Sequence, residues 1–234
     1  MKRRVRPLKG FPGVYEVAAE NDRWVLATKN LTPGRKVYGE SIISWQGEEY
    51  RVWNPYRSKL AAAINKGLKE LPIKPGKRVL YLGAASGTTV SHVSDIVDLK
   101  GCVYCVEFAP RPMRELIESV AVFRENVFPI LEDARFPKRY KNLVGAVDVI
   151  YCDIAQPEQA KVLVDNASLY LKEDGGFMIA VKAMSIDVTK DPEETFKNEA
   201  LVLRKGGFEI RETVPLEPYD KAHVMITGNQ RLPP

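Results

Sequence analysis

The spacing of apolar and polar positions changes near residue 54, and the change divides the chain into two parts. Before it, short runs of aromatic and β-branched residues alternate with turn sequences such as Thr32-Pro33-Gly34-Arg35. Strands joined by short polar turns are typical of β-hairpins. The first part is therefore predicted to form two hairpins, with strands at residues 14–18, 24–28, 41–45 and 49–53.

The boundary falls at Asn54-Pro55, because the residue before a proline avoids helical backbone angles. We expect residues 1–54 to form a small antiparallel β domain and residues 55–234 to form the main domain. A β unit this small buries little apolar surface by itself. It is therefore expected to pack against the main domain or against a second copy of itself, as in a homodimer.

After residue 54 two patterns alternate along the chain. Continuous apolar runs predict buried strands, and apolar residues repeated every three or four positions predict helices. The expected strands are 79–82, 102–106, 127–131, 147–152, 177–181, 208–214 and 224–227. The first expected helix carries Leu60, Ile64 and Leu68 on one face and ends before Pro72. The other expected helices are 88–97, 110–123, 160–171 and 193–205. Gly175-Gly176 is expected to turn the chain before the fifth strand.

Strands that alternate with helices predict an α/β fold built on a mostly parallel sheet. The link between the last two strands, residues 215–222, is too short for a helical crossover, so the seventh strand should run antiparallel to the sixth. His223, directly before this strand, then lies at the edge where the parallel strands end.

A glycine loop follows the first strand of the main domain. Gly83 and Gly87 interrupt the apolar run, and Thr88 opens a segment with helical spacing. Glycine lets a ligand approach the backbone, and a helix N-terminus offers free N–H groups. The spacing Gly-x-x-x-Gly is not the Gly-x-Gly-x-x-Gly of dinucleotide binders, so a pyrophosphate is not expected. Alone, the loop could equally be a packing turn, and together with Glu107 at the end of the next strand it predicts a nucleoside ligand.

Polar residues stand where the next strands end. Glu107 is placed to accept hydrogen bonds from two ribose hydroxyls. Asp133 could accept from an adenine amino group, or it could equally cap a turn. Asp153 and Lys182 end the fourth and fifth strands, and the carboxyl ends of parallel strands face the ligand crevice. Lys59, in the first turn of its helix, looks by pattern alone like a surface lysine.

Charge is uneven along the chain, although the net charge is only +5. Residues 2–9 contain five basic residues and no acidic one. Residues 51–78 contain eight basic residues and a single acidic one, Glu70, and residues 135–141 contain four basic residues and no acidic one. Such clusters suggest a polyanionic partner, and an ordinary solvated surface is the competing interpretation.

Cysteine and histidine content bounds the remaining chemistry. Cys102 and Cys105 lie in a predicted strand, so we interpret them as core thiols of a reducing compartment rather than as a disulfide. Two histidines make a zinc site improbable, so no metal is predicted. No signal core or membrane-spanning run is apparent. We expect an intracellular, soluble, cytoplasmic protein.

Four segments together resemble the fibrillarin family, in its archaeal form, which lacks a glycine- and arginine-rich N-terminal tail: Ser58 to Ile64, Gly83 to Asp95, Asp133 to Pro137 and Asp153 to Pro157. The resemblance covers nearly the whole chain. It implies a class I methyltransferase (Rossmann-like) fold and a box C/D guide ribonucleoprotein enzyme. That enzyme would transfer methyl groups from S-adenosylmethionine to ribose 2′-hydroxyls of rRNA, and of tRNA in some cases.

The resemblance also implies partners and site residues. The partners are a box C/D guide RNA with its target, a Nop-domain scaffold protein and a kink-turn-binding ribosomal-type protein. The cofactor residues it implies are Ala85, Thr88, Thr89, Glu107, Phe108, Asp133, Ala134, Asp153 and Gln156. The catalytic set it implies is Lys59, Asp153, Lys182 and His223. Cys152 stands where many relatives have alanine, a small change that affects only local packing.

Lys182 is the residue that would act on the 2′-hydroxyl, as base or as orienting donor. A nearby Lys59 would lower the pKa that such a base needs, and Asp153 would raise it. Three rival functions share parts of the pattern: an NAD-dependent oxidoreductase, a non-catalytic subunit of an RNA particle, and a methyltransferase acting on a protein side chain such as glutamine. The missing third glycine disfavours the first, and the four catalytic-type residues disfavour the second.

Overall fold

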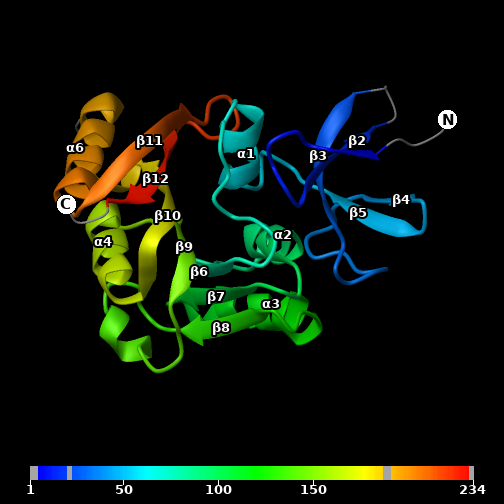
Figure 1. The fold of residues 1–234 in the computed structure, drawn as a ribbon, viewed down its shortest axis with the longest axis horizontal. Helices are drawn as coiled ribbons and strands as arrows, with labels where there is room; N and C mark the ends of the chain where they lie inside the picture. Colours follow the sequence, from blue (N-terminus) through cyan, green and yellow to red (C-terminus); the bar gives the residue numbers. More distant parts are fainter. Residues whose placement is uncertain (1–4, 20–22, 187–190, 232–234) are drawn as a thin grey trace.

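The computed structural model describes residues 5–19, 23–186 and 191–231, and it contains two β-sheets with helices between and beside them (Figure 1). The small sheet has β1 (Val5–Pro7), β2 (Val14–Ala18), β3 (Trp24–Lys29), β4 (Ile42–Trp45) and β5 (Glu48–Val52). The large sheet has β6 (Arg78–Leu82), β7 (Cys102–Glu107), β8 (Val127–Leu131), β9 (Val147–Cys152), β10 (Leu171–Lys182), β11 (Phe208–Pro215) and β12 (His223–Gln230). The helices are α1 (Lys59–Asn65), α2 (Thr88–Val97), α3 (Pro110–Ser119), α4 (Gln159–Tyr170), α5 (Ala183–Ile186) and α6 (Pro192–Lys205), with 3-10 turns at Ala121–Phe123 and Pro137–Tyr140.

The small sheet is antiparallel throughout, in the order β1-β2-β3-β5-β4. The two predicted hairpins, β2 with β3 and β4 with β5, are confirmed. Strand β1 was not predicted, because three residues, one of them a proline, are too few to establish an alternation of apolar and polar positions. It is held at the sheet edge by pairing with β2 and by a 2.7 Å ion pair between Arg6 and Glu16.

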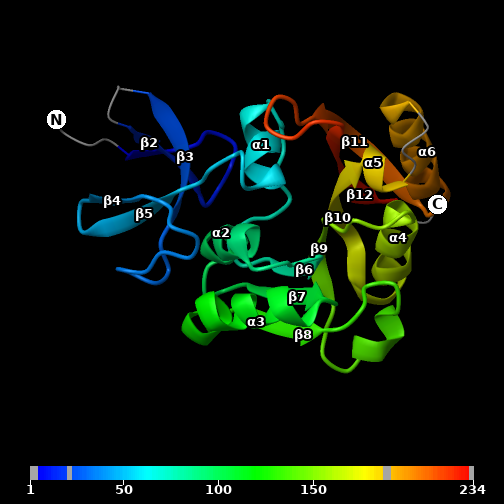
Figure 2. The same cartoon turned by 180° about the vertical axis from the view of Figure 1, so that it is seen from behind.

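The large sheet has the order β11-β12-β10-β9-β6-β7-β8. Its central neighbours are parallel, and β12 runs antiparallel to both β10 and β11 (Figure 2). The predicted α/β fold with an antiparallel last strand is confirmed. Its consequence for the site is direct, since His223 pairs in register with Lys182.

Several predicted elements differ from the structure in their bounds, and two of them differ at glycines. Helix α1 ends at Asn65 rather than continuing through Leu68, because Gly67 takes a left-handed φ of +92°. Gly175-Gly176 lies inside β10, at a register shift between Leu171 and Gly176, instead of forming a turn before the strand. Both differences arise at glycines, one that ends a helix and one that lies at an irregularity within a strand. The pattern of apolar positions does not distinguish these two uses of glycine.

Helices cover both faces of the large sheet. On one face α4 and α6 pack over the side chains that include Leu80, Leu82 and Ile150. On the other face α1, α2 and α3 pack in a cluster that also includes Phe11 and Trp53 from the first part of the chain. The expected packing of the small β unit against the main domain is therefore confirmed, and α2 lies between the two sheets (Figure 1). The proposed division at residue 54 falls between β5 and α1.

A buried polar network fastens the two sheets together through α2. The Arg51 guanidinium donates to Asp95 Oδ2 at 2.8 Å, to Glu40 Oε1 at 2.7 Å and to the Ser91 hydroxyl at 2.8 Å. Asp95 also accepts from Arg124 at 2.6 Å. Because these charges are buried, each depends on its partners to offset the loss of hydration.

Cys105 is buried as expected, whereas Cys102 is partly exposed and therefore is not a core thiol. Among residues 5–19, 23–186 and 191–231, no helix is long and apolar enough to cross a membrane. Within the same ranges no cluster of three or more histidine, cysteine or acidic side chains is arranged to hold a metal ion.

Candidate active site

Most of the residues predicted to act together lie where strands of the large sheet end, and Lys59 comes to them from the first turn of α1. The glycine loop follows β6, and Glu107, Asp153 and Lys182 end or follow β7, β9 and β10. His223 begins the antiparallel β12 and so joins the same edge. Parallel strands thus bring together residues that are far apart in the sequence.

The glycine loop has little room for side chains. Gly83 has a φ of +82°, and a Cβ atom at this position would lie 2.3 Å from the Asp153 carbonyl oxygen. Gly87, with a φ of +93°, is the N-cap of α2, which has no side-chain cap. The loop therefore requires glycine at both positions, and the first N–H groups of α2 keep their donor capacity.

Glu107 holds the loop from the next strand. Its Oε2 accepts from the Ala85 N–H at 2.9 Å, and its Oε1 accepts from the Ala109 N–H at 2.9 Å. An ionised carboxylate has about four acceptor sites, so further sites remain for the two ribose hydroxyls. Phe108, beside it, is 62% exposed, which is a large apolar surface for a residue at this edge.

Asp133 is engaged by its neighbour Arg135. Both carboxylate oxygens accept from the guanidinium, at 2.6–3.2 Å, and Oδ1 also accepts from the Arg135 N–H at 2.9 Å. These hydrogen bonds lower the pKa of the carboxyl group. The turn-capping interpretation thus describes this structure, and a contact with adenine would have to share the carboxylate with Arg135. Ala134 is buried, and its carbonyl accepts from Asn166.

Lys59 and Asp153 form an ion pair. Lys59 Nζ lies 2.8 Å from Asp153 Oδ1 and 3.1 Å from Oδ2. Ser58 caps α1 and accepts from the Thr89 hydroxyl at 3.0 Å, so the helix carrying Lys59 is tied to the glycine loop. Burial opposes the charged lysine, but the Asp153 carboxylate outweighs it, and the pKa of Lys59 is raised.

Lys182 and His223 face each other across β10 and β12. The Lys182 N–H donates to Gln159 Oε1 at 3.1 Å, which anchors the strand end to α4. His223 Nδ1 lies 2.7 Å from the Lys221 carbonyl oxygen and 3.0 Å from Asp220 Oδ1. Asp220 also approaches Lys59 Nζ at 4.0 Å, so the two halves of the predicted catalytic set are linked through it.

A cavity of about 250 Å³ opens at the Lys59–Asp153 ion pair. Its lining comprises Pro55, Tyr56, Arg57, Ser58, Lys59, Thr89, Asp153, Tyr219 and Asp220. Gln156, in the loop after β9, has a buried Oε1 without a hydrogen-bond partner among the described residues. A buried acceptor of this kind is open to a donor from a ligand or from a water molecule.

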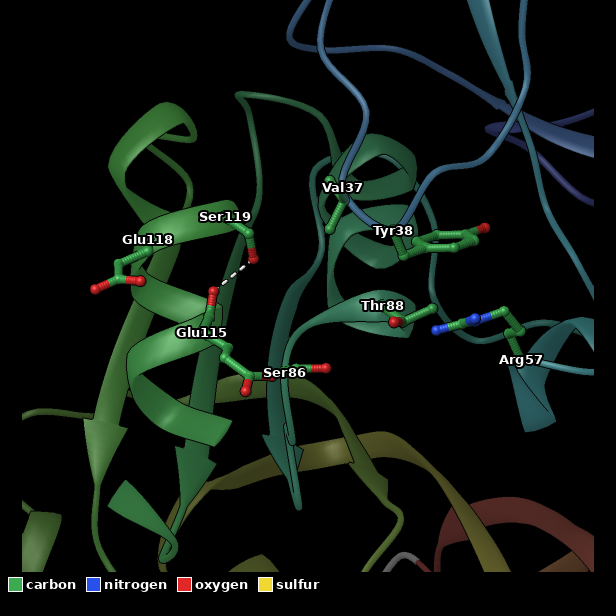
Figure 3. Close-up of a pocket in the computed structure, with 8 residues that line it drawn as sticks. All are labelled: Val37, Tyr38, Arg57, Ser86, Thr88, Glu115, Glu118 and Ser119. Carbon is green, nitrogen blue, oxygen red and sulfur yellow. Dashed lines mark hydrogen bonds between the residues drawn. The ribbon is translucent and has the colours of Figure 1, made fainter. Parts of the chain in front are cut away.

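A second hollow, of about 340 Å³, lies between the glycine loop, α3 and the segment of Val37 and Tyr38 (Figure 3). Thr88 lines this hollow together with Tyr38 and Ser86, whereas Thr89 lines the first cavity. Arg57 borders both and points toward Thr88 in Figure 3. The two adjacent threonines predicted to bind cofactor therefore open into different spaces in this structure.

Sequence reasoning missed Asp220 and the pair Tyr56 and Tyr219, whose rings lie edge to face with centroids 5.0 Å apart. Asp220 and Tyr219 come from the link 215–222, which the pattern treats only as a connection. Ser58 could have been found, because a serine directly before a run of helical spacing is a typical N-cap.

Comparison with known proteins decides the family. The fibrillarin family model matches residues 5–232. The chain belongs to the fibrillarin family. The fibrillarin-like rRNA/tRNA 2′-O-methyltransferase of Pyrobaculum aerophilum is 58% identical over 228 residues, which cover 97% of each chain.

Solved fibrillarin structures agree with the fold. The Aeropyrum pernix fibrillarin, solved with natively bound S-adenosyl-L-methionine, is 54% identical and superposes with a TM-score of 0.90 over 96% of this chain and 97% of that one. The fibrillarin of a fibrillarin/Nop5p complex is 43% identical, with a TM-score of 0.83 over 96% of this chain and all of the other. The predicted family and fold are confirmed.

Proposed function

We propose that this fibrillarin transfers the methyl group of S-adenosylmethionine to ribose 2′-hydroxyls of rRNA and tRNA. The observation that carries the proposal is the meeting of a nucleoside-type glycine loop with the Lys59–Asp153 pair and the Lys182–His223 pair at one sheet edge. The name of the Pyrobaculum relative and the cofactor of the Aeropyrum structure support it.

The residues at the edge fit S-adenosylmethionine. Glu107 retains acceptor sites for ribose hydroxyls, Phe108 offers an exposed apolar face for adenine, and Gln156 has a buried acceptor without a described partner. Gly83, Ala85, Gly87, Thr88, Thr89, Asp133, Ala134 and Asp153 complete the proposed cofactor set. The bound cofactor supplies an electrophilic methyl group on a sulfonium.

The task left to the protein is to hold a 2′-oxygen in line with that methyl group. Positioning of reactants can supply roughly 7–11 kcal/mol of the barrier in favourable cases. Lys59 fixes the Asp153 carboxylate through both of its oxygens, so that the wall of the cavity is rigid where the ribose would enter. Lys182 is assigned to the 2′-oxygen itself.

Two roles fit Lys182, and pH separates them. As a neutral amine it would accept the 2′-proton, and as an ammonium group it would donate a hydrogen bond to the oxygen. If it is the base, the rate of the chemical step rises with pH through the alkaline range. A flat alkaline profile, with chemistry limiting the rate, assigns it the donor role.

Target choice is proposed to come from base pairing with a box C/D guide RNA, because the chain has no recognised RNA-reading module. The basic clusters would contact phosphates without reading sequence. A Nop-domain scaffold would dock the enzyme on the particle, as the complex of a relative with Nop5p suggests. A kink-turn-binding protein of the same particle and a homodimer are part of the same proposal.

The decisive experiment is methyl transfer from labelled S-adenosylmethionine to a guide-paired RNA in the reconstituted particle. The wild type is compared with Lys182→Ala, and the normal target with one carrying 2′-deoxyribose at the acceptor. Label should enter RNA with the wild type alone, and only when the 2′-hydroxyl is present.

Other outcomes point to the rival functions. Label in a protein band, retained with the deoxy target, would favour a glutamine acceptor. Cofactor binding without any transfer would favour a non-catalytic subunit. A nicotinamide cofactor in place of S-adenosylmethionine would favour the oxidoreductase.

A further inference from the structure

Asp220 stands between two residues of the proposed catalytic set that come from distant parts of the chain. Its Oδ2 lies 4.0 Å from Lys59 Nζ, and its Oδ1 lies 3.0 Å from His223 Nδ1. Its side chain is 35% exposed and lines the cavity that also contains Asp153. Nothing in the apolar pattern of the sequence gave this residue a role.

The contacts of His223 determine where its ring proton lies. The Lys221 carbonyl lies 2.7 Å from Nδ1 with hydrogen-bond geometry, and the Asp220 carboxylate lies 3.0 Å from the same nitrogen as an ion-pair contact. Neither oxygen can donate, so Nδ1 must carry the hydrogen. In the neutral ring the lone pair is then on Nε2, and no hydrogen bond from a described residue reaches that nitrogen.

The position of Asp220 is set by the loop that precedes β12. The N–H groups of Tyr219 and Asp220 both donate to the Leu216 carbonyl, at 3.0 and 3.3 Å. The Leu216 N–H in turn donates to the His223 carbonyl at 3.0 Å. This closed loop carries the carboxylate back toward the start of β12.

His223 presents its ring beside Lys182. The two residues are direct partners in the antiparallel ladder, and such partners project their side chains to the same face. A hydroxyl group both donates and accepts one hydrogen bond or more. An acceptor nitrogen next to an ammonium group therefore matches a ribose 2′-hydroxyl.

We infer that Asp220 is a positioning residue, which holds His223 in its Nδ1–H tautomer so that Nε2 accepts the hydrogen bond of the target 2′-hydroxyl. Lys182 then takes the donor role toward the 2′-oxygen. The inference rests on the proposed function for the identity of the hydroxyl. The tautomer itself does not depend on activity.

The tautomer is directly measurable, because the chain has only two histidines. In the ¹⁵N-histidine-labelled full-length protein, long-range ¹H–¹⁵N spectra at a pH where the rings are neutral show which nitrogen of each ring carries hydrogen. The His223→Gln variant identifies the signals of His92. We expect His223 to show hydrogen on Nδ1. Hydrogen on Nε2 instead would overturn the inference.

Variants at Asp220 test its part in the tautomer. Asp220→Ala leaves only the Lys221 carbonyl, so the His223 signals should move toward the Nε2–H form that water favours. Glu217→Gln removes an acid from the same loop and should leave the spectrum unchanged. An Asp220→Ala spectrum identical to that of the wild type would show that the carbonyl alone fixes the ring, and Asp220 would lose the role.

Kinetics tests the role of the acceptor. In the reconstituted particle, Asp220→Ala should lower kcat about tenfold or more, with KM for S-adenosylmethionine unchanged, and Asp220→Glu should restore part of the loss. An altered tautomer with normal kcat would overturn the role of Nε2. If the wild type transfers no methyl group to RNA, the proposed function fails, while the spectra still decide the tautomer.

Discussion

The Lys59–Asp153 pair illustrates how much a single contact decides at the residue scale. Its side chains are 25% and 21% exposed, so solvent screens the attraction and the pair contributes little net stability. Its importance is geometric, because Lys59 binds both oxygens of the carboxylate and α1 is capped by a serine that contacts the glycine loop.

A double-mutant cycle measures this coupling. Lys59→Met and Asp153→Asn should each destabilise the fold, because each leaves a partly buried charge without its partner. The double variant should recover about 1 kcal/mol relative to the sum. Urea unfolding gives the four free energies. Fully additive losses would mean that the pair carries no interaction energy.

The positions of single site residues were predictable where the residue ends a strand. They were not predictable where the position depends on a contact with a residue far away in the sequence. Glu107 and Asp153 were placed by position alone, and the structure has them at those strand ends. Lys59 was not, because its pairing joins residues 94 positions apart. The guanidinium that occupies Asp133 is only two residues away, yet a sequence pattern does not show which way a side chain turns.

At the scale of elements, the glycine loop depends on the strand beside it. An alanine at residue 83 would place its Cβ atom 2.3 Å from the backbone of Asp153, so β6 and the end of β9 would have to separate. The glycine loop and the backbone that carries the Asp153 carboxylate are therefore packed so closely that one cannot shift without the other.

Gly83→Ala tests that close packing against a matched control. Gly67 has a similar φ of +92° with no atom within 4 Å of a Cβ, so Gly67→Ala bears the backbone strain alone, about 1 kcal/mol. Gly83→Ala should destabilise more than this and weaken S-adenosylmethionine binding at least about tenfold. Thermal unfolding and calorimetric titration check both. Equal effects from the two variants would contradict the clash.

Element boundaries were predicted well where apolar runs are continuous. β7, β8 and β9 agree with expectation within a residue, since each is a continuous apolar run. The expectation that all are buried is wrong for β8, because it lies at the edge of the sheet and exposes Phe128 and Leu131. The predicted helix 110–123 closes as α3 at Ser119 and continues as a 3-10 turn. Strand β1 and the bent β10 depend on pairing with other strands, which local spacing does not encode.

At the scale of the whole molecule, the two sheets are joined by charges that are out of water. His92 lies in this contact, stacked on Trp53, with Nδ1 2.7 Å from the Thr28 hydroxyl and Nε2 2.7 Å from the Tyr38 hydroxyl. Burial, together with the Arg51 and Arg124 charges, lowers the pKa of His92 well below its ordinary value.

This lowered pKa makes stability depend on pH. Below about pH 6.5 the unfolded chain protonates His92 while the folded protein does not, so acid favours unfolding. The free energy of unfolding should fall between pH 6.5 and 5 by up to about 1.4 kcal/mol per unit. His92→Gln should flatten this slope. Depressed carboxyl pKa values, such as that of Glu40, act only at lower pH, so an unchanged slope in the variant would contradict the assignment.

The placement of β12 also orders events during synthesis. Among the described strands it comes after all the others in chain order, yet it lies between β10 and β11 and provides the only described pairing of β11. Until residues 223–230 are made, β11 has no described partner strand, although it packs against α6, and His223 is absent from the edge. The glycine loop and the end of β9 can therefore form before β12 is present, whereas the proposed catalytic set is complete only once β12 has inserted between β10 and β11.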